Sequence, residues 1–153
     1  MSSKDPVRTL VLPLQGATAV LPQAGIAEIV SFSETEAIER PQGEIEILGL
    51  IDWHQFSVPV IALESVVGRP FGEPGAKAKV AICNALDNSQ QHPAIGIVLE
   101  SVPRVLVVED GRRLPAAQEK SEFALSSRHQ GDLVWIPDME KIGHSVNQQL
   151  ALD

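Results

Sequence analysis

The chain has 153 residues, a length typical of one compact unit, and 44% of them are hydrophobic, which is enough to build a core and argues against intrinsic disorder. Twelve Lys and Arg against twenty Asp and Glu give a formal net charge of −8. A negative protein repels phosphates, so nucleic acid and anionic membranes are poor partners. Only 4% of the residues are aromatic and there is no Tyr, so we expect a core of Val, Ile, Leu and Ala.

The first half of the chain consists of short apolar or alternating runs separated by turn residues, which is the pattern of β-strands. Gly16 suits a turn that needs a positive φ, and Pro22 ends a run because proline cannot donate to a ladder. A helical turn is expected near Glu64, closed by Gly68. The predicted strands of this half are residues 7–14, 17–21, 26–32, 48–53 and 58–63.

The second half follows a Pro- and Gly-rich connector at 69–75 and repeats the pattern. Beyond Pro137 the apolar residues recur at helical spacing, which predicts an amphipathic helix over about 138–150. Gly143 is expected to weaken this helix by about 1 kcal/mol. The predicted strands of this half are residues 79–86, 94–100, 104–108, 123–127 and 132–136.

Two segments of equal length, 48–68 and 123–143, echo each other. Each has the layout of strand, tight tip, apolar strand and helical turn, which indicates an internal duplication. We therefore expect one all-β domain with two packed β-barrel subdomains, 7–68 and 79–143, plus short helices and the C-terminal helix. The matching pairs are His54-Gln55 with His129-Gln130, Ile61 with Ile136, and Gly68 with Gly143.

Cys83 is the only cysteine and lies in an apolar run, so we expect a buried small hydrophobe and no disulfide. Residues 1–6 lack the apolar stretch of a signal peptide. No segment approaches the roughly 18 apolar residues of a membrane span. These observations predict a cytoplasmic protein that does not insert into a membrane.

Sequence motifs of catalysis and metal binding are absent: there is no phosphate-binding loop, dinucleotide fingerprint, zinc-protease motif or nucleophile elbow. We therefore expect no enzyme, no cofactor and no metal site. The four histidines are scattered, and His54 and His129 approach each other only if the two barrel tips converge. That possibility leaves a small ligand- or metal-binding β-barrel as an alternative function.

Trp53 and Phe56 flank the predicted tip at His54-Gln55. Exposed aromatic residues at a loop tip often anchor protein–protein contacts, although packing back onto the barrel explains them equally well. Glu28 interrupts an apolar strand, and either an outward-facing polar position or a partner contact accounts for it.

Residues 47–63, ILGLIDWHQFSVPVIAL, resemble the pattern G-V-I-N-L-R-G-x-x-I-P-V-I-D-L of the CheW-like family. Residues 94–106, AIGIVLESVPRVL, are similar to that family's G-L-V-V-D-x-V-x-x-V-L, and residues 26–29 are similar to a V-x-E-I element. The resemblance covers residues 7 to 147 and implies two SH3-like five-stranded β-barrels.

The same resemblance implies a non-enzymatic adaptor that couples chemoreceptors to a chemosensory histidine kinase. One surface would pair with the kinase's regulatory domain, and another, near the junction of the two barrels, would take the receptor's cytoplasmic tip. The contact residues that it implies, together with the two aromatic residues of the tip, are Ile26, Glu28, Gly49, Trp53, His54, Phe56, Gly96, Leu99, Val102 and Val105.

The chain departs from the family pattern in three places. His54-Gln55 stands where the family often has Arg-Gly, Ala62 replaces the acid of I-P-V-I-D-L, and a Tyr-Gly pair is absent. Replacing an Arg removes a rigid bidentate donor. These departures predict a divergent, accessory member of the family, such as one serving type IV pili and twitching motility, or a competitor of the main coupling protein.

Overall fold

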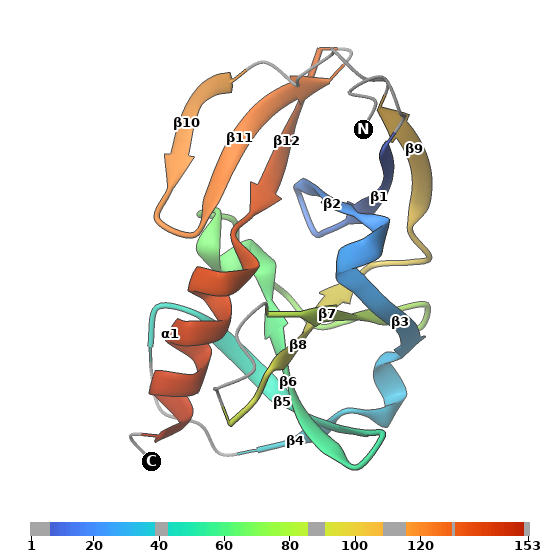
Figure 1. Ribbon diagram of the computed structural model, residues 1–153, viewed down its shortest axis with the longest axis vertical. Helices are drawn as coiled ribbons and strands as arrows, with labels where there is room; N and C mark the ends of the chain where they lie inside the picture. Colours follow the sequence, from blue (N-terminus) through green and yellow to red (C-terminus); the bar gives the residue numbers. More distant parts are fainter. Residues whose placement is uncertain (1–6, 39–42, 86–90, 109–115, 130, 152–153) are drawn as a thin grey trace, which may run out of the picture.

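The computed structural model describes residues 7–38, 43–85, 91–108, 116–129 and 131–151. In this part of the chain, two six-stranded sheets lie one above the other (Figure 1). The helix α1 (Met139–Ala151) runs beside the lower sheet. The protein is therefore mostly β with a C-terminal helix, which confirms the class of fold that the alternating apolar runs predict.

One sheet, here called the terminal sheet, takes its strands from both ends of the chain. Its strand order is β10-β11-β12-β2-β1-β9. Every neighbouring pair is antiparallel except β12 and β2, which are parallel. The strands are β1 (Val7–Pro13), β2 (Thr18–Pro22), β9 (Arg104–Val108), β10 (Ala116–Ser121), β11 (Ala124–His129) and β12 (Asp132–Pro137).

The other sheet, here called the central sheet, is built from the middle of the chain in the order β3-β7-β8-β6-β5-β4. Its only parallel pair in the described residues is β6 and β8. Its strands are β3 (Ile26–Ser31), β4 (Glu36–Ala37), β5 (Glu46–Trp53), β6 (Phe56–Ala62), β7 (Lys79–Asn84) and β8 (Ala94–Leu99). Three short 3₁₀ helices complete this region: η1 (Gln23–Gly25), η2 (Phe32–Glu34) and η3 (Leu63–Val66).

The two sheets share one topology. The order β10-β11-β12-β2-β1-β9 corresponds to β4-β5-β6-β8-β7-β3, with the parallel pair at the same place. The echoing hairpins β5–β6 and β11–β12 occupy equivalent positions. Sheet membership does not follow the predicted halves 7–68 and 79–143, however, because the hairpin β1–β2 pairs with β12 and β9 and not with β3 to β6.

Neither sheet closes into a barrel within the described residues, and each has six strands where five were expected. The edge strands of the central sheet are β3 and β4, and those of the terminal sheet are β9 and β10. The additional strands are β4 and β10, whose sequences EA and AAQEKS lack the apolar alternation that marks a strand. Both strands form through main-chain pairing at a sheet edge, and the periodicity of the sequence does not reveal such pairing.

Several strands are buried on both faces because each sheet curls around its own apolar cluster while also facing a shared core. In β7, Val80 and Ile82 belong to the cluster inside the central sheet, whereas Ala81 and Cys83 face the shared core. The strand β8 is buried along its whole length. This two-sided burial explains the continuous apolar runs in β6, β7 and β8.

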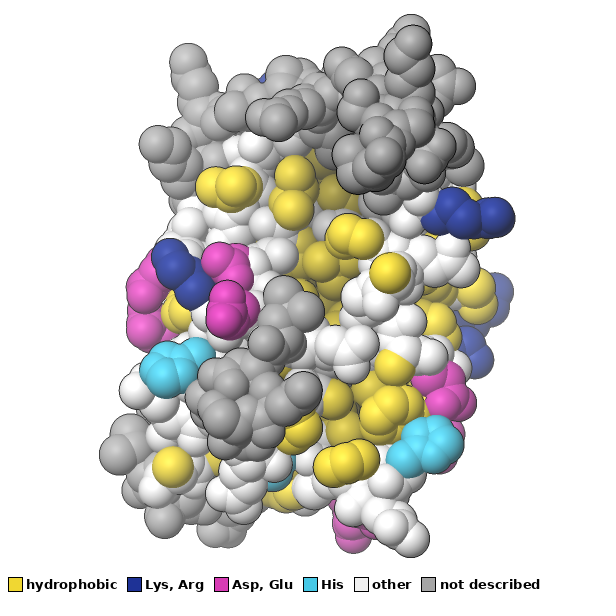
Figure 2. Space-filling model, viewed as in Figure 1, with side chains coloured by type: hydrophobic (Ala, Val, Ile, Leu, Met, Phe, Trp, Pro, Cys, Tyr) yellow, Lys and Arg dark blue, Asp and Glu magenta, His cyan; other side chains and the backbone are white. Residues whose placement is uncertain are grey.

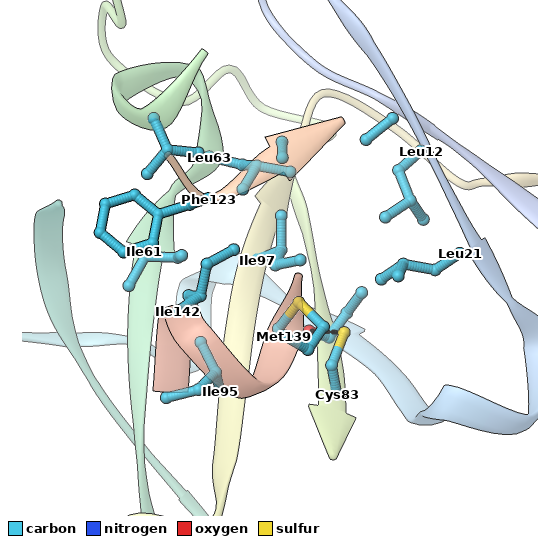
Figure 3. Packing of buried hydrophobic residues seen from close by; sticks show 14 of the residues in the cluster. Leu12, Leu21, Ile61, Leu63, Cys83, Ile95, Ile97, Phe123, Met139 and Ile142 are labelled. Atoms are coloured by element: carbon cyan, nitrogen blue, oxygen red, sulfur yellow. Dashed lines mark hydrogen bonds between the residues drawn. The ribbon is translucent and has the colours of Figure 1, made fainter. Parts of the chain in front are cut away.

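The shared core joins the two sheets and the helix. Figure 3 shows Leu12 and Leu21 of the terminal sheet pointing toward the same interior as Ile95 and Ile97 of the central sheet. Met139 and Ile142 of α1 enter this cluster, as their helical spacing predicts. Burial of apolar area at roughly 25 cal/mol per Å² makes this interior the main force that holds the two sheets together.

Two amide side chains of α1 fix the helix against the central sheet. Gln149 accepts a hydrogen bond from the Ile45 N–H at 3.1 Å and donates one to the Ile45 carbonyl at 2.9 Å. Asn147 makes the same pair of bonds with His92, at 2.7 and 2.9 Å. Both amides are buried, so each satisfies main-chain groups that would otherwise lose water without a partner.

Gly143 of α1 packs against Ala85, directly after β7 of the central sheet. A Cβ built at this position would lie 2.6 Å from the Cβ of Ala85, far inside van der Waals contact. The glycine that weakens the helix on propensity grounds is therefore required by helix–sheet packing. Gly68, its counterpart in the echo, has φ of 73° and closes η3 instead, so the two glycines match in sequence but not in role.

Candidate protein-contact surfaces

The hairpin β5–β6 ends in a two-residue turn formed by His54 and Gln55. Both have positive φ, 48° and 68°, and they connect the cross-strand pair Trp53 and Phe56. This is the geometry of a type I′ turn, which favours Asn-Gly because side chains with a Cβ are strained there. The tip is thus rigid, and its backbone is strained at the position where the sequence departs from the family pattern.

Glu28 on the edge strand β3 meets this tip. The indole Nε1–H of Trp53 donates a hydrogen bond of 2.8 Å to Glu28 Oε1, and His54 Nε2 lies 3.7 Å from the same oxygen. The rings of Trp53 and His54 pack edge to face with centroids 4.6 Å apart. Glu28 is therefore a positioned acceptor that ties the tip to β3.

The two aromatic residues of the tip behave differently. Trp53 is half-buried and packs against the apolar cluster inside the central sheet, so for this residue packing back onto the sheet is the correct interpretation. Phe56 remains 52% exposed. An exposed aromatic ring on a rigid turn is well suited to anchor a protein contact.

A second group of exposed apolar residues follows β8. Val102 is 63% exposed in the connection to β9, and Val105 on β9 is 52% exposed. Ile26, at the start of β3, is half-buried against the shared core. Figure 2 shows hydrophobic side chains gathered along the middle of the viewed face, from the region of the terminal sheet toward the central sheet.

Three residues expected near partner contacts are buried. Gly96 and Leu99 lie in β8, which is covered on both faces, and Leu99 is 1% exposed. A Cβ at Gly96 would lie 2.7 Å from Val80 Cγ1, and one at Gly49 would lie 2.3 Å from the Glu36 carbonyl oxygen. These residues therefore present no side chain to a partner, and the two glycines permit close packing of neighbouring strands; that they lie near a partner contact stays a prediction.

The described residues offer little reactive chemistry. Burial raises the pKa of the Cys83 thiol to about 12, so the thiolate is not available as a nucleophile. No group of three or more His, Cys, Asp or Glu in the described part of the chain could hold a metal ion. His54 lies at the tip of the central sheet, whereas His129 lines a groove of the terminal sheet, and no contact between them is found.

An acidic cleft lies beside α1, with a volume of about 390 Å³. Glu44, Glu122 and Glu140 line it, together with Phe123 and Lys141. The neighbouring carboxylate of Glu122 raises the pKa of Glu44. The residues of this cleft come from three separate segments of the chain, so no local pattern predicts that they meet.

Glu64 is a buried titratable group that the sequence does not reveal. Its position after an apolar strand suggests an exposed first turn of a helix, yet it is only 1% exposed in η3. Burial is the main cause that raises its pKa, and hydrogen bonding from the main chain opposes the effect.

No helix among the described residues is long and apolar enough to cross a membrane. A β-scaffold with exposed apolar residues at a turn and near strand ends has features that protein-binding proteins use. The model of the CheW-like domain family matches residues 8–147. The chain therefore belongs to the CheW-like family, whose members are non-enzymatic scaffold proteins of chemotaxis signalling.

The fold is similar to that of the scaffolding protein TtCheW from Thermoanaerobacter tengcongensis, known from a crystal structure. The TM-score is 0.66 at 17% sequence identity, and the match covers 87% of this chain and 89% of that one. No curated protein sequence matches the chain significantly.

Proposed function

We propose that this protein is a cytoplasmic adaptor that couples chemoreceptors to a chemosensory histidine kinase, with the whole chain acting as one domain. The observation that carries the proposal is the pairing of a CheW-like fold with exposed apolar residues held on rigid elements. An adaptor requires no reactive group, and weak contacts of roughly 1,000 Å² gain strength when an array repeats them.

The tip of the central sheet is our candidate for the kinase contact. Phe56 supplies the exposed ring, and the bonds among Glu28, Trp53 and His54 hold the turn that presents it. A turn already fixed before binding loses little conformational entropy on association. This rigidity favours a defined docking surface over an adaptable one.

Val102 and Val105 are our candidates for the receptor contact. They follow β8, the central strand that leads directly into β9 at the edge of the terminal sheet. Val102 lies in the connection between the two sheets and Val105 on the adjoining edge strand β9, which supports a contact near the junction that the family resemblance implies for a receptor's helical tip. An exposed pair of valines would bury apolar area against such a helix.

Binding titrations with the kinase regulatory domain and with a receptor cytoplasmic fragment test the two contacts separately. We expect Phe56→Ala to weaken kinase binding about tenfold and to leave receptor binding unchanged. Val105→Glu should weaken receptor binding by a similar factor. Leu125→Glu is the matched control, because Leu125 is 66% exposed on β11, outside both proposed surfaces.

Failure of the unmodified protein to bind either partner would refute the proposal, and an equal effect of Leu125→Glu would refute the assignment of surfaces. A gene deletion separates a coupling protein from a competitor, since loss of a coupling protein lowers kinase output and loss of a competitor raises it. Swimming and twitching assays of the same deletion identify the motility system that it serves.

A further inference from the structure

Glu64 lies where the two sheets meet. It belongs to η3, directly after β6 of the central sheet, and is 1% exposed. Its Oε2 accepts a hydrogen bond of 2.7 Å from the N–H of Gln15, in the turn between β1 and β2 of the terminal sheet. One carboxyl group thus links the two sheets.

Gln15 extends this link to the connector between η3 and β7. Its side chain accepts a hydrogen bond of 2.7 Å from the Gly72 N–H and donates one of 3.2 Å to the Glu73 carbonyl. Glu64, Gln15 and residues 72–73 therefore form one continuous chain of hydrogen bonds. If the bond at Glu64 loosens, the turn and the connector lose a shared anchor.

The second carboxyl oxygen, Oε1, is buried without a hydrogen-bond partner in the protein. A small pocket of about 10 Å³ lies beside Glu64, and its lining includes Phe71, Val98 and Glu100. A void of this size holds about one water molecule. An ionised carboxylate is stabilised by several donors, whereas here the main chain supplies only the N–H groups of Gln15 and of Glu64 itself, and Oε1 receives none.

The charged groups around Glu64 are mostly acidic. Glu46 on β5 and Glu100 after β8 act on it through space and disfavour its negative charge. From the connector, Arg69 bonds the Glu64 carbonyl through its main-chain N–H at 3.0 Å, and Glu73 contributes its main-chain carbonyl to Gln15. A neutral carboxyl group fits these surroundings better than an ionised one.

We propose that Glu64 is a proton-dependent latch between the two sheets, closed when it carries a proton on Oε1 and loosened when that proton is lost. In the open state the connector lifts from the central sheet, water reaches the carboxylate, and the anchor at Gln15 is released. This device lies apart from the proposed contact surfaces and goes beyond the coupling function.

Hydrogen exchange of the Gln15 and Gly72 amides across about pH 5 to pH 9 tests the latch. Between the ordinary value of 4.5 and the raised pKa of the folded protein, the closed state binds one more proton than the open state. Their protection factors should therefore fall roughly tenfold per pH unit in this range and then level off. In Glu64→Gln, which cannot ionise, protection should not depend on pH.

Glu100→Gln is the matched control, because it makes the same chemical change at an exposed neighbour. In Glu100→Gln the protection factors should still depend on pH, and the midpoint of their change should lie at lower pH. Equal pH dependence in the native protein and Glu64→Gln would overturn the proposal. If Glu64→Gln does not fold, ¹³C NMR titration of the native protein decides, since a Glu64 carboxyl that titrates near 4.5 refutes the latch.

Discussion

The indole of Trp53 and the carboxylate of Glu28 are joined by a hydrogen bond of 2.8 Å. The two residues come from β5 and β3, which are separated in the central sheet by β7, β8 and β6. Their bond therefore connects two distant parts of one curled sheet. Main-chain pairing does not close the central sheet into a barrel, but this side-chain bond joins β5 to the edge strand β3.

A double-mutant cycle of Trp53→Phe and Glu28→Ala measures this link. Phe retains the ring but removes the donor, so we expect a coupling free energy of about 1 kcal/mol in urea unfolding. The pair Trp53→Phe and Glu34→Ala is the control, because Glu34 is exposed outside the bond. A coupling of the same size in the control would show that the bond is not the cause.

The strained turn at His54-Gln55 offers a stabilising substitution. Gln55 has φ of 68°, a conformation that glycine adopts without steric cost, so Gln55→Gly should raise the free energy of unfolding by about 0.5–1 kcal/mol. Gln148→Gly, in the helix, should lower it by about 1 kcal/mol. Chemical denaturation of both variants checks the prediction, which fails if Gln55→Gly is also destabilising.

The buried amide of Gln149 in α1 should stabilise the folded protein although it is polar. Replacing Gln149 by Leu leaves the N–H and carbonyl of Ile45 without their partner, and we expect a loss of about 1–3 kcal/mol in the free energy of unfolding. Gln148→Leu is the matched control on an exposed position of the same helix. Equal stability of the two variants would contradict the structural role of Gln149.

Gly143 should not tolerate the alanine that helix propensity favours. Propensity alone predicts that Gly143→Ala gains about 1 kcal/mol, whereas the 2.6 Å approach to the Ala85 Cβ predicts a net loss of stability. Ala85→Gly removes the clashing atom and should rescue Gly143→Ala in thermal unfolding. If Gly143→Ala is more stable than the native protein, α1 can move away from Ala85 without a loss of stability, and the prediction is wrong.

Glu64 should make the protein less stable as pH rises. Its folded-state pKa lies above the ordinary value of 4.5, so the folded state binds more protons than the unfolded state between the two values. The free energy of unfolding should therefore fall as pH rises through that range and stay low above it. Urea unfolding at several pH values measures this effect. The free energy of unfolding of Glu64→Gln should not fall over this range, and at neutral pH it should be higher than that of the native protein.

The sequence by itself determined the β class, most of the strands, the C-terminal helix and the family, because periodicity, turn residues and two ordered motifs are local signals. It also identified the echo between β5–β6 and β11–β12. It did not predict β4 and β10, since pairing at a sheet edge leaves no apolar alternation in EA or AAQEKS.

Only the tertiary structure decided which hairpin completes which sheet, because no local sequence signal specifies that β1–β2 pairs with β12 and β9. Similar apolar runs contain both exposed and buried residues. Long-range packing decided that Phe56 and Val102 are exposed and that Leu99 and Gly96 are buried. It brought Glu28 to Trp53 across 25 residues of chain and Gln15 to Glu64 across 49. Burial and hydrogen-bond partners are properties of neighbours in space, and only the folded chain fixes those neighbours.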